Sequence, residues 1–392
     1  MSAAVGPAAD APFDLAEGRV VVVGGGLATA RICAVLRRKK FRGALTVLGA
    51  EDLPPYDRPP LSKEVLAGLR DDSALPFDVE KLDVDLRLGT RATALDTASR
   101  TVTTTAGPVE YDRLALATGA EPLTLPGEGQ QLTLRTLEDS LRLRAALVPG
   151  ARVVVIGASW IGAEVTTVAR ANGCQVTCVE YGAEPLAGAL GAEVGAATRG
   201  WWDGVDLRTS TAVASVEPDG VHLESGAVLP ADVVVTGIGV RPRVSWLASS
   251  EVETDRGVLT DTRCRTNVHG VVALGDVAQR WSSRTGTHRV LEHWDEASTA
   301  ATAAAMSLLS WDEGPMHDPV PYFWSDQLGR KLQYVGAHGP EDAVTVDRHP
   351  DGSLARARWS RDGLLTAWLG VGAAKDLVAA RTAVGGPLAD LG

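Results

Sequence analysis

The stretch RVVVIGASWIGAEVTTVARANGCQVTCVE (residues 152–180) contains three predicted elements in succession. Its apolar, β-branched run Val153–Ile156 has the length of a strand that is buried on both faces. The pattern Gly-x-Ser-x-x-Gly at 157–162 then opens a helical segment, which ends at Gly173. A second apolar run, Val176–Val179, follows. We therefore expect two parallel strands joined by a crossover helix, with a glycine-rich turn before the helix.

The glycine pattern is a fingerprint for a bound dinucleotide, although alone it also fits a plain turn in an α/β sheet. Gly157 permits the tight turn, and Gly162 lets the helix pack closely on the strand. Ser159 replaces the second glycine, so the backbone should approach a pyrophosphate less closely. The helix N-terminus offers free N–H groups and a partial positive charge. Glu180 can accept from both ribose hydroxyls and would repel a 2′-phosphate, so NADH should be preferred over NADPH.

A second copy of this arrangement lies near the start of the chain. The buried run Arg19–Val23 leads into GGGLAT at 24–29, a helical segment, a strand Leu45–Leu48 and then Glu51. Thr29 occupies the third glycine position, so helix and strand should lie slightly farther apart here. Two such units indicate two dinucleotides, or one dinucleotide and a degenerate copy.

Composition limits the class of protein. The chain has 392 residues, which suggests two or three domains, and 45% of them are hydrophobic. The net charge of −11 argues against general nucleic-acid binding. No cation precedes Arg19, which argues against a signal peptide, and the apolar helix candidate Thr299–Leu309 is too short to span a membrane. Four cysteines without a dense framework fit a reducing compartment, so a cytoplasmic protein is expected.

The segment PPYDRPPLSK at 54–63 is stiff, because prolines flank Arg58 on both sides. It places Arg58 and Lys63 just after the first dinucleotide unit, which suggests charges held near a phosphate or a flavin ring. This segment, the two fingerprints and the later segments ATG at 117–119 and LGD at 274–276 resemble the FAD-dependent ferredoxin reductases. These are the reductase components of bacterial oxygenase systems, and they are related to rubredoxin reductases and apoptosis-inducing factor.

The resemblance extends roughly over residues 19–336 and implies an α/β fold with two Rossmann-like dinucleotide-binding domains in a glutathione-reductase-like architecture, plus a small α+β C-terminal domain. It implies a discontinuous FAD-binding domain at 19–128 and 256–318, an NAD-binding domain at 129–255 and a C-terminal interface domain at 319–392. Residues 1–18 are Ala-, Pro- and Gly-rich and are expected to be a disordered tail.

The resemblance also implies cofactor contacts. Arg135 is alternatively a surface charge, and Asp276 is alternatively a helix cap. The residues expected to bind FAD are Gly24, Gly26, Ala28, Glu51, Arg58, Lys63, Ala92, Thr118, Gly119, Arg135, Gly275, Asp276 and Trp294. The residues expected to bind NADH are Gly157, Ser159, Trp160, Ile161, Gly162, Glu164, Glu180 and Gly239.

Three of these positions carry the expected chemistry. By resemblance, Trp160 provides an aromatic ring that covers the flavin and swings aside for nicotinamide, and Glu164 pairs with Lys63 beside the flavin N5. The alternative is that Trp160 belongs to the core and Glu164 is a solvated helix charge. Cys174 and Cys178 alternate along one strand face and are expected to be buried thiols, so disulfide-reductase chemistry is disfavoured. No histidine has a metal-like spacing, so no metal site is expected.

The electron acceptor is less well defined by the residues. The family implies a two-iron two-sulfur ferredoxin, and Trp324 either lies between the flavin and the cluster or is a packing tryptophan with a tethered N–H. Thr302 stands where the family helix usually carries a basic docking residue. Alternative docking surfaces are the basic segment 37–42, or the group Arg356, Arg358, Arg361 and Lys375. We expect an NADH:ferredoxin reductase that supplies a monooxygenase or dioxygenase. The alternatives are a direct NADH oxidase or pathway flavoenzyme, and an NADH-responsive redox-sensing interaction protein, and the chain is expected to be a monomer or a homodimer.

Overall fold

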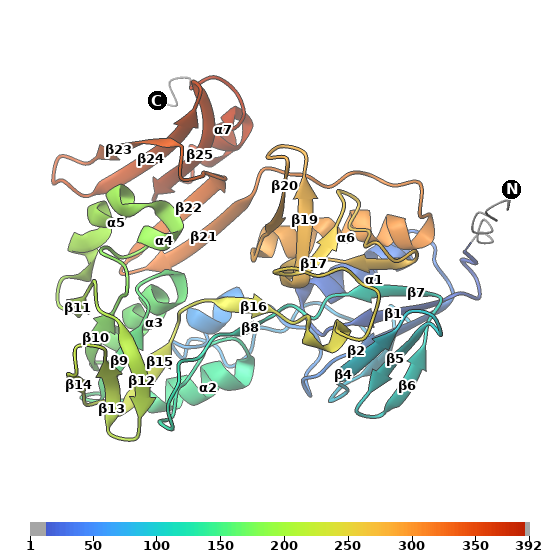
Figure 1. The fold of residues 1–392 in the computed structure, drawn as a ribbon, viewed down its shortest axis with the longest axis horizontal. Helices are drawn as coiled ribbons and strands as arrows, with labels where there is room; N and C mark the ends of the chain where they lie inside the picture. Colours follow the sequence, from blue (N-terminus) through green and yellow to red (C-terminus); the bar gives the residue numbers. More distant parts are fainter. Residues whose placement is uncertain (1–12, 389–392) are drawn as a thin grey trace, which may run out of the picture.

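The computed structural model describes residues 13–388, which form two parallel sheets and an antiparallel C-terminal sheet (Figure 1). Most of the expected disordered tail, residues 1–12, lies outside the described residues. Residues 13–18 are folded rather than disordered, because Phe13 stacks on Phe41 with ring centroids 5.8 Å apart. Among the described residues, no helix combines the length and apolar composition that a membrane crossing requires.

The first parallel sheet has the strand order β18-β7-β1-β2-β3. Its strands are β1 (Arg19–Val23), β2 (Ala44–Leu48), β3 (Asp85–Arg87), β7 (Arg113–Leu116) and β18 (Val271–Ala273). All neighbouring pairs are parallel. The late strand β18 joins beside β7, so the chain returns to this sheet after it has built the second one. Helices α1 (Leu27–Arg38) and α6 (Trp294–Leu309) pack against each other and share one apolar core with this sheet.

The second parallel sheet has the order β11-β10-β9-β15. Its strands are β9 (Arg152–Ile156), β10 (Gln175–Val179), β11 (Asp206–Arg208) and β15 (Val233–Thr236), and the crossover helix is α3 (Trp160–Ala171). The predicted strand, helix and strand of the opening stretch are therefore confirmed. Short strands β8 (Ala120–Pro122) and β16 (Val240–Pro242) pair antiparallel between the two sheets. The predicted domain boundaries stay a prediction.

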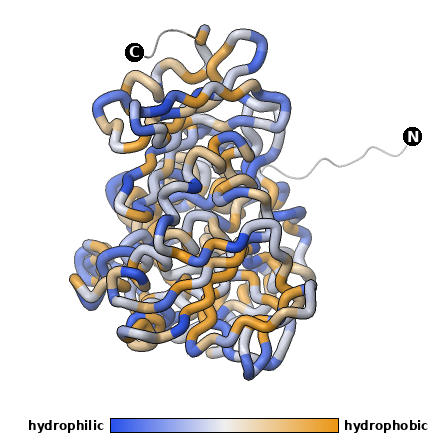
Figure 2. The backbone as a smooth tube through the Cα atoms, turned by 90° about the vertical axis from the view of Figure 1, so that its left-hand side faces the viewer, coloured by the Kyte–Doolittle hydropathy of each residue, from blue (hydrophilic) through white to orange (hydrophobic). Residues whose placement is uncertain are grey.

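The C-terminal sheet is antiparallel, with the order β21-β22-β25-β24-β23. Its strands are β21 (Tyr322–Gln327), β22 (Arg330–Gly336), β23 (Ala343–Arg348), β24 (Leu354–Arg361) and β25 (Leu364–Val371). One face of this sheet shares a continuous apolar core with α3 and α5 of the second sheet, through residues such as Leu332, Trp359 and Leu369. In Figure 2, apolar segments run through the middle of the molecule and hydrophilic segments gather toward its edges.

The remaining elements are short and surround these three sheets. They are α2 (Leu137–Ala146), α4 (Ala187–Leu190), α5 (Ala192–Thr198) and α7 (Leu377–Ala383), the 3-10 turns η1 (Pro59–Ser62), η2 (Arg199–Trp202), η3 (Ser245–Leu247) and η4 (Gly275–Val277), and the strands β4 (Ala92–Asp96), β5 (Thr101–Thr104), β6 (Gly107–Glu110), β12 (Val213–Glu217), β13 (Gly220–Leu223), β14 (Val228–Leu229), β17 (Val258–Thr260), β19 (Ala278–Ser282) and β20 (Thr287–Val290).

The sequence predicts helices over 297–309 and 373–384, and both begin elsewhere in the structure. Helix α6 starts at Trp294 rather than Ala297, because Asp295 and Glu296 stabilise its positively charged first turn. The last helix, α7, covers Leu377–Ala383 rather than 373–384, because Ala373 instead accepts a turn hydrogen bond from the amide of Asp376.

Candidate functional site

A cavity of about 980 Å³ opens between the two parallel sheets. Both glycine-rich turns line it, and the C-terminal sheet contributes Phe323 and Trp324. All residues predicted to bind a cofactor line this one cavity except Gly162, which packs helix α3 onto its sheet instead. The structure therefore brings together segments that are up to about 270 residues apart in the chain, because parallel strands present their carboxyl ends at one edge of each sheet.

The glycines at the two turns have steric reasons to be glycine. Gly24 has φ +131°, and a Cβ there would lie 2.0 Å from the carbonyl oxygen of Ala117. Gly157 has φ +101°, and a Cβ would lie 2.4 Å from the carbonyl oxygen of Gly237. At the third position of the first turn, buried Thr29 donates from Oγ1 to the carbonyl oxygen of Gly24 at 2.8 Å, so this side chain ties the helix to the turn.

Glu51 and Glu180, the acidic residues that follow the second strand of the two dinucleotide units, both accept hydrogen bonds within the chain. Glu180 accepts from the backbone amides of Ala158 and Gly182, each at 2.7 Å. Glu51 accepts from the Arg58 guanidinium at 3.1 Å and from the hydroxyl of Tyr56. Glu180 is thereby held at its own glycine-rich turn, and both carboxylates line the cavity, where a ribose of a bound dinucleotide would meet them.

Glu164 is the centre of a buried polar network. Its side chain is only 4% exposed and lies 2.9 Å from Lys63 Nζ. It also accepts from the hydroxyl of Ser62, from Ser325 Oγ at 2.6 Å and from the amide of Asp326 at 3.2 Å. One carboxylate thus joins the proline-rich segment, helix α3 and the C-terminal sheet. The alternative that Glu164 is a solvated helix charge is excluded by its burial.

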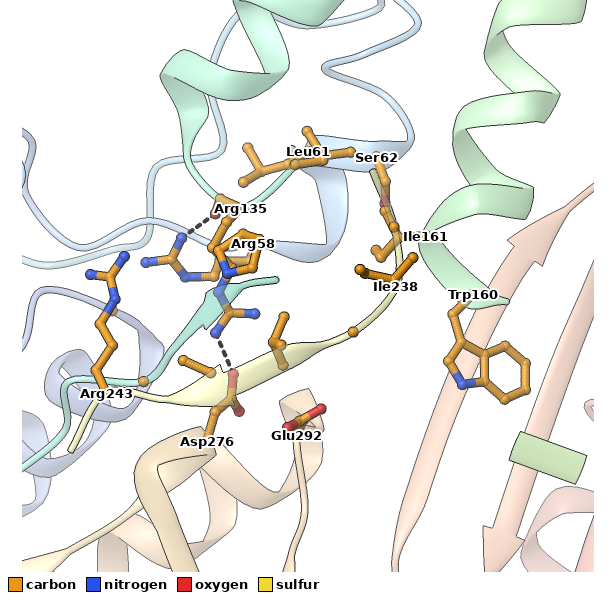
Figure 3. Close-up of a pocket in the computed structure, with 18 of the residues that line it drawn as sticks. Arg58, Leu61, Ser62, Arg135, Trp160, Ile161, Ile238, Arg243, Asp276 and Glu292 are labelled. Carbon is orange, nitrogen blue, oxygen red and sulfur yellow. Dashed lines mark hydrogen bonds and ion pairs between the residues drawn. The ribbon is translucent and has the colours of Figure 1, made fainter. Parts of the chain in front are cut away.

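Four arginines gather around the same cavity: Arg58, Arg91, Arg135 and Arg243. Arg58 pairs with Glu51, and Arg135 pairs with Asp276. Figure 3 shows Arg58, Arg135 and Arg243 close together at one end of the pocket, away from Trp160. Among the described residues, the buried Nε atoms of Arg135 and Arg243 find no hydrogen-bond partner.

Aromatic rings form the opposite side of the cavity. Trp160 meets Phe323 edge-on with ring centroids 4.7 Å apart, and His293 stacks on Phe323 at 4.6 Å. Burial lowers the pKa of His293, so its ring is neutral at pH 7. Trp294 donates from its indole Nε1 to Asp57 at 2.7 Å, and its ring centroid lies 6.0 Å from that of Trp324. Trp160 therefore lines the cavity and, being only partly buried, also packs against the apolar core.

The sequence did not single out Arg243 or Glu292. Glu292 lines the cavity beside Asp276 (Figure 3), and burial, with a smaller contribution from the Asp276 charge, raises its pKa to about 7. The available signal is sequence proximity, since Glu292 lies two residues before Trp294, which the resemblance assigns to FAD. Arg243 follows the flagged Gly239 by four residues, but a lone arginine in a loop carries no recognisable pattern.

No thiol contributes to the cavity lining among the described residues. All four cysteines are free. Cys33, Cys178 and Cys264 are buried, whereas Cys174, which the strand pattern predicts to be buried, is only partly buried. Burial raises the pKa of each of the three buried thiols far above pH 7, so they stay protonated and unreactive. In the described part of the chain, no group of histidine, cysteine and carboxylate side chains could hold a metal ion.

A cavity framed by two dinucleotide turns defines an oxidoreductase that brings two nucleotide cofactors together. The chain belongs to the pyridine nucleotide-disulphide oxidoreductase family, whose model matches residues 18–301. A second family model, described as a reductase C-terminal domain, matches residues 322–386.

Named relatives cover nearly the whole chain. A biphenyl dioxygenase system ferredoxin–NAD(+) reductase component from Paraburkholderia xenovorans is 35% identical over 382 residues, which are 93% of each chain. A crystal structure of Fdr9 superposes with a TM-score of 0.91 at 51% identity and covers 94% of this chain and 95% of that one. A covalent putidaredoxin reductase–putidaredoxin complex superposes with a TM-score of 0.88 at 28% identity, over 94% and 93% of the two chains.

Family membership implies FAD and NADH as cofactors, and the cavity residues fit them. A Cβ at Gly24 or Gly157 would clash with the backbone at the glycine-rich turns. Because glycine has no Cβ, the N-termini of α1 and α3 stay open to pyrophosphates. The Arg243 guanidinium lines the cavity, is 32% exposed and has no carboxylate nearer than 3.8 Å among the described residues, so an anion in the cavity would supply its missing partner. The absence of a thiol from the described lining fits a cofactor pair that exchanges electrons without a protein disulfide.

Proposed function

We propose that this protein is an NADH:ferredoxin reductase that supplies electrons to a monooxygenase or dioxygenase. The observation that carries this proposal is the single cavity that both glycine-rich turns and the Lys63–Glu164 ion pair line. FAD, when bound, accepts two electrons as a hydride and releases them singly to a one-electron carrier. The names of the relatives support a ferredoxin as the carrier.

We propose that FAD occupies the first turn. The N-terminus of α1, with Gly24, Gly26 and Ala28, would face its pyrophosphate, and Glu51 would accept from the adenosine ribose. The other residues proposed to contact FAD are Arg58, Lys63, Ala92, Thr118, Gly119, Arg135, Gly275, Asp276 and Trp294. The Arg135–Asp276 pair argues against the alternative that either residue is a surface charge or a helix cap, since neither side chain is more than 18% exposed and Leu274 caps the turn η4.

We propose that NADH occupies the second turn, with its pyrophosphate at the N-terminus of α3 near Gly157, Ser159 and Ile161. Glu180 would exchange one of its backbone amide partners for the ribose hydroxyls, and its charge would reject a 2′-phosphate. Gly239 would let the backbone lie close to the cofactor. NADH should therefore be used in strong preference to NADPH.

Between the two cofactors, we propose that Lys63 and Glu164 hold a fixed dipole and that Trp160 covers the flavin until nicotinamide enters. The Lys63–Glu164 pair is almost fully buried, so its field is weakly screened by water. Trp160 is only partly buried and meets Phe323 edge-on, which supports a ring that can be displaced from the cavity. Neither group is consumed, since hydride transfer requires no general base at these positions.

In both basic surfaces predicted to dock the ferredoxin, arginines are already engaged within the chain, by ion pairs or by hydrogen bonds to the backbone. Arg356 and Arg358 pair with Asp347, and Arg361 pairs with Asp342. Arg37, in the other basic group, donates to three backbone carbonyls and to a fourth at Asp83. We propose instead that a two-iron two-sulfur ferredoxin docks over Trp324, which lines the cavity, stacks on Tyr322 and meets Trp294 edge-on. We place this reaction in the cytoplasm.

The test is NADH-dependent reduction of cytochrome c, measured with and without two-iron two-sulfur ferredoxins under air and under argon. Ferredoxin should stimulate the rate at least about tenfold, because direct transfer to cytochrome c lacks a docked geometry. Trp324→Phe should lower the stimulated rate and leave anaerobic flavin reduction by NADH unchanged, whereas Trp281→Phe, at an exposed indole elsewhere, should change neither. Rapid NADH turnover with oxygen alone and no ferredoxin stimulation would instead identify an NADH oxidase.

A further inference from the structure

Arg243 lies where the chain leaves the second parallel sheet. It directly follows strand β16, which pairs antiparallel with β8. Its backbone amide donates to the carbonyl oxygen of Gly119 at 2.9 Å, and its carbonyl oxygen accepts from Thr118 Oγ1 at 3.1 Å. The backbone of Arg243 is therefore held against the segment that leaves the first sheet, and its side chain is aimed from this junction into the shared cavity.

The side chain of Arg243 lacks a close counter-ion. Its nearest described carboxylate is Glu121, at 3.8 Å from Nε, and Glu121 already accepts from Arg241 at 2.6 Å. Three further guanidinium groups surround it: Arg58, Arg91 and Arg135. Burial, opposed in part by Glu121 and reinforced by these cations, lowers the pKa of Arg243. A half-buried guanidinium among like charges is unfavourable unless an anion joins the group.

The carboxylates of the cluster are already committed to other arginines. Glu51 serves Arg58, and Asp276 serves Arg135. Neither reaches Arg243 within an ion-pair distance among the described residues, and the Arg243 side chain is still 32% exposed at the cavity. An anion with several acceptor oxygens is therefore the ligand that completes this end of the cavity. A diphosphate group has the charge and the acceptor geometry for forked guanidinium donors.

We propose that Arg243 binds the diphosphate of FAD and thereby fastens the segment that leaves the second sheet onto the cofactor held by the first. The proposal rests on FAD as the occupant of the first turn, but not on the identity of the electron acceptor. Loading of FAD should consequently order the junction of β8 and β16, since the same residue holds the diphosphate by its side chain and Thr118 and Gly119 by its backbone.

The test is the dissociation constant of FAD for the FAD-depleted full chain, measured by quenching of flavin fluorescence. Arg243→Gln should weaken FAD binding at least about tenfold, the usual effect of removing a charge-assisted hydrogen bond. Arg243→Lys should recover part of the loss because it keeps the charge. Arg241→Gln is the matched control, since it removes a neighbouring arginine that is 70% exposed and shares the same Glu121 partner.

Two further measurements separate the phosphate contact from a merely structural role. Glu121→Gln removes the carboxylate that lies 3.8 Å from Arg243 Nε and leaves Arg243 free for the diphosphate, so FAD binding should persist. Hydrogen exchange at 120–122 and 240–243 should slow on FAD addition in the wild-type and Arg241→Gln proteins, and should not slow in Arg243→Gln. The proposal is overturned if Arg243→Gln retains full FAD affinity, or if Glu121→Gln loses as much affinity as Arg243→Gln. Failure of ferredoxin stimulation would leave this result unaffected, so the two proposals fail separately.

Discussion

At the scale of single residues, Glu164 concentrates four donors on one buried carboxylate. Lys63, Ser62, Ser325 and the amide of Asp326 all point at it, and its side chain is 4% exposed. Such a group is stable only while its partners remain in place, because an unpaired charge in this environment loses its water without compensation. The charge distribution in the cavity therefore depends on how three parts of the chain are placed: the proline-rich segment 54–63, helix α3 and the C-terminal sheet.

Glu164→Gln should lower the thermal unfolding midpoint of the FAD-loaded protein by roughly 5 °C, because it strands Lys63, and breaking a buried pair costs about 3 kcal/mol. The measurement is a thermal melt followed by circular dichroism and by flavin fluorescence. Glu138→Gln is the control, since Glu138 pairs with Arg142 on the surface with 80% of its side chain exposed, and its midpoint should move by less than about 1 °C. Equal midpoints for both variants would contradict the buried role of Glu164.

The residues around Glu164 show what a single sequence can and cannot predict. Lys63 and Glu164 were predicted as a pair, although 101 residues separate them, because each lies in a recognisable segment. Ser62 and Ser325 were not predicted as its partners. A serine hydroxyl carries no local pattern, and its proximity to Glu164 is decided by how the C-terminal sheet packs on α3. Arg243 likewise carries no local pattern, so the sequence does not predict its place in the cavity.

At the scale of elements, the sequence predicts the fold where the hydrophobic pattern and a glycine-rich turn indicate the same strand and helix. The strands β1 and β9 and the helices that follow them were expected, and the structure confirms them. Helix ends were less predictable, because α6 begins three residues earlier and α7 four residues later than expected. The start of α6 depends on acidic residues in its first turn, and the start of α7 on a turn hydrogen bond before it. Such local interactions, rather than helix propensity alone, decide where a helix begins.

The contact of α3 with β9 leads to a prediction about Gly162. A Cβ at Gly162 would lie 1.8 Å from the carbonyl oxygen of Gly157, so Gly162→Ala must push the N-terminus of α3 away from its turn. NADH binding should weaken at least about tenfold, while the FAD content per chain stays normal. Anaerobic titration of the flavin absorbance with NADH measures both quantities. Gly200→Ala, where no atom lies within 4 Å of the added Cβ, is the control. Normal NADH affinity in Gly162→Ala would show that the turn tolerates the displacement.

At the scale of the whole molecule, the C-terminal sheet is not a separate lobe. Its apolar face and the helices α3 and α5 of the second sheet form one continuous core. Leu332, Trp359 and Leu369, all on the C-terminal strands, are at most 2% exposed within this core. The second parallel sheet and the C-terminal sheet should therefore unfold together.

Leu369→Ala tests this shared core, because Leu369 is completely buried on strand β25. Removing it should cost about 2–5 kcal/mol and accelerate hydrogen exchange in α3 and in β22 together. Leu364→Ala is the control, since Leu364 lies on the same strand but is 45% exposed, and exchange in both elements should stay as in the wild type. Faster exchange confined to the C-terminal strands would mean that the two sheets open independently.

The continuity of this core also bears on how such enzymes can be recombined. A graft of residues 319–392 from another reductase, made to change the electron acceptor, would bring half of an interior without its counterpart on α3 and α5. It would also bring a foreign residue to the position of Ser325, which faces Glu164. A workable exchange would transplant the second parallel sheet and the C-terminal strands together, with cuts at β8, at β16 and again before β21.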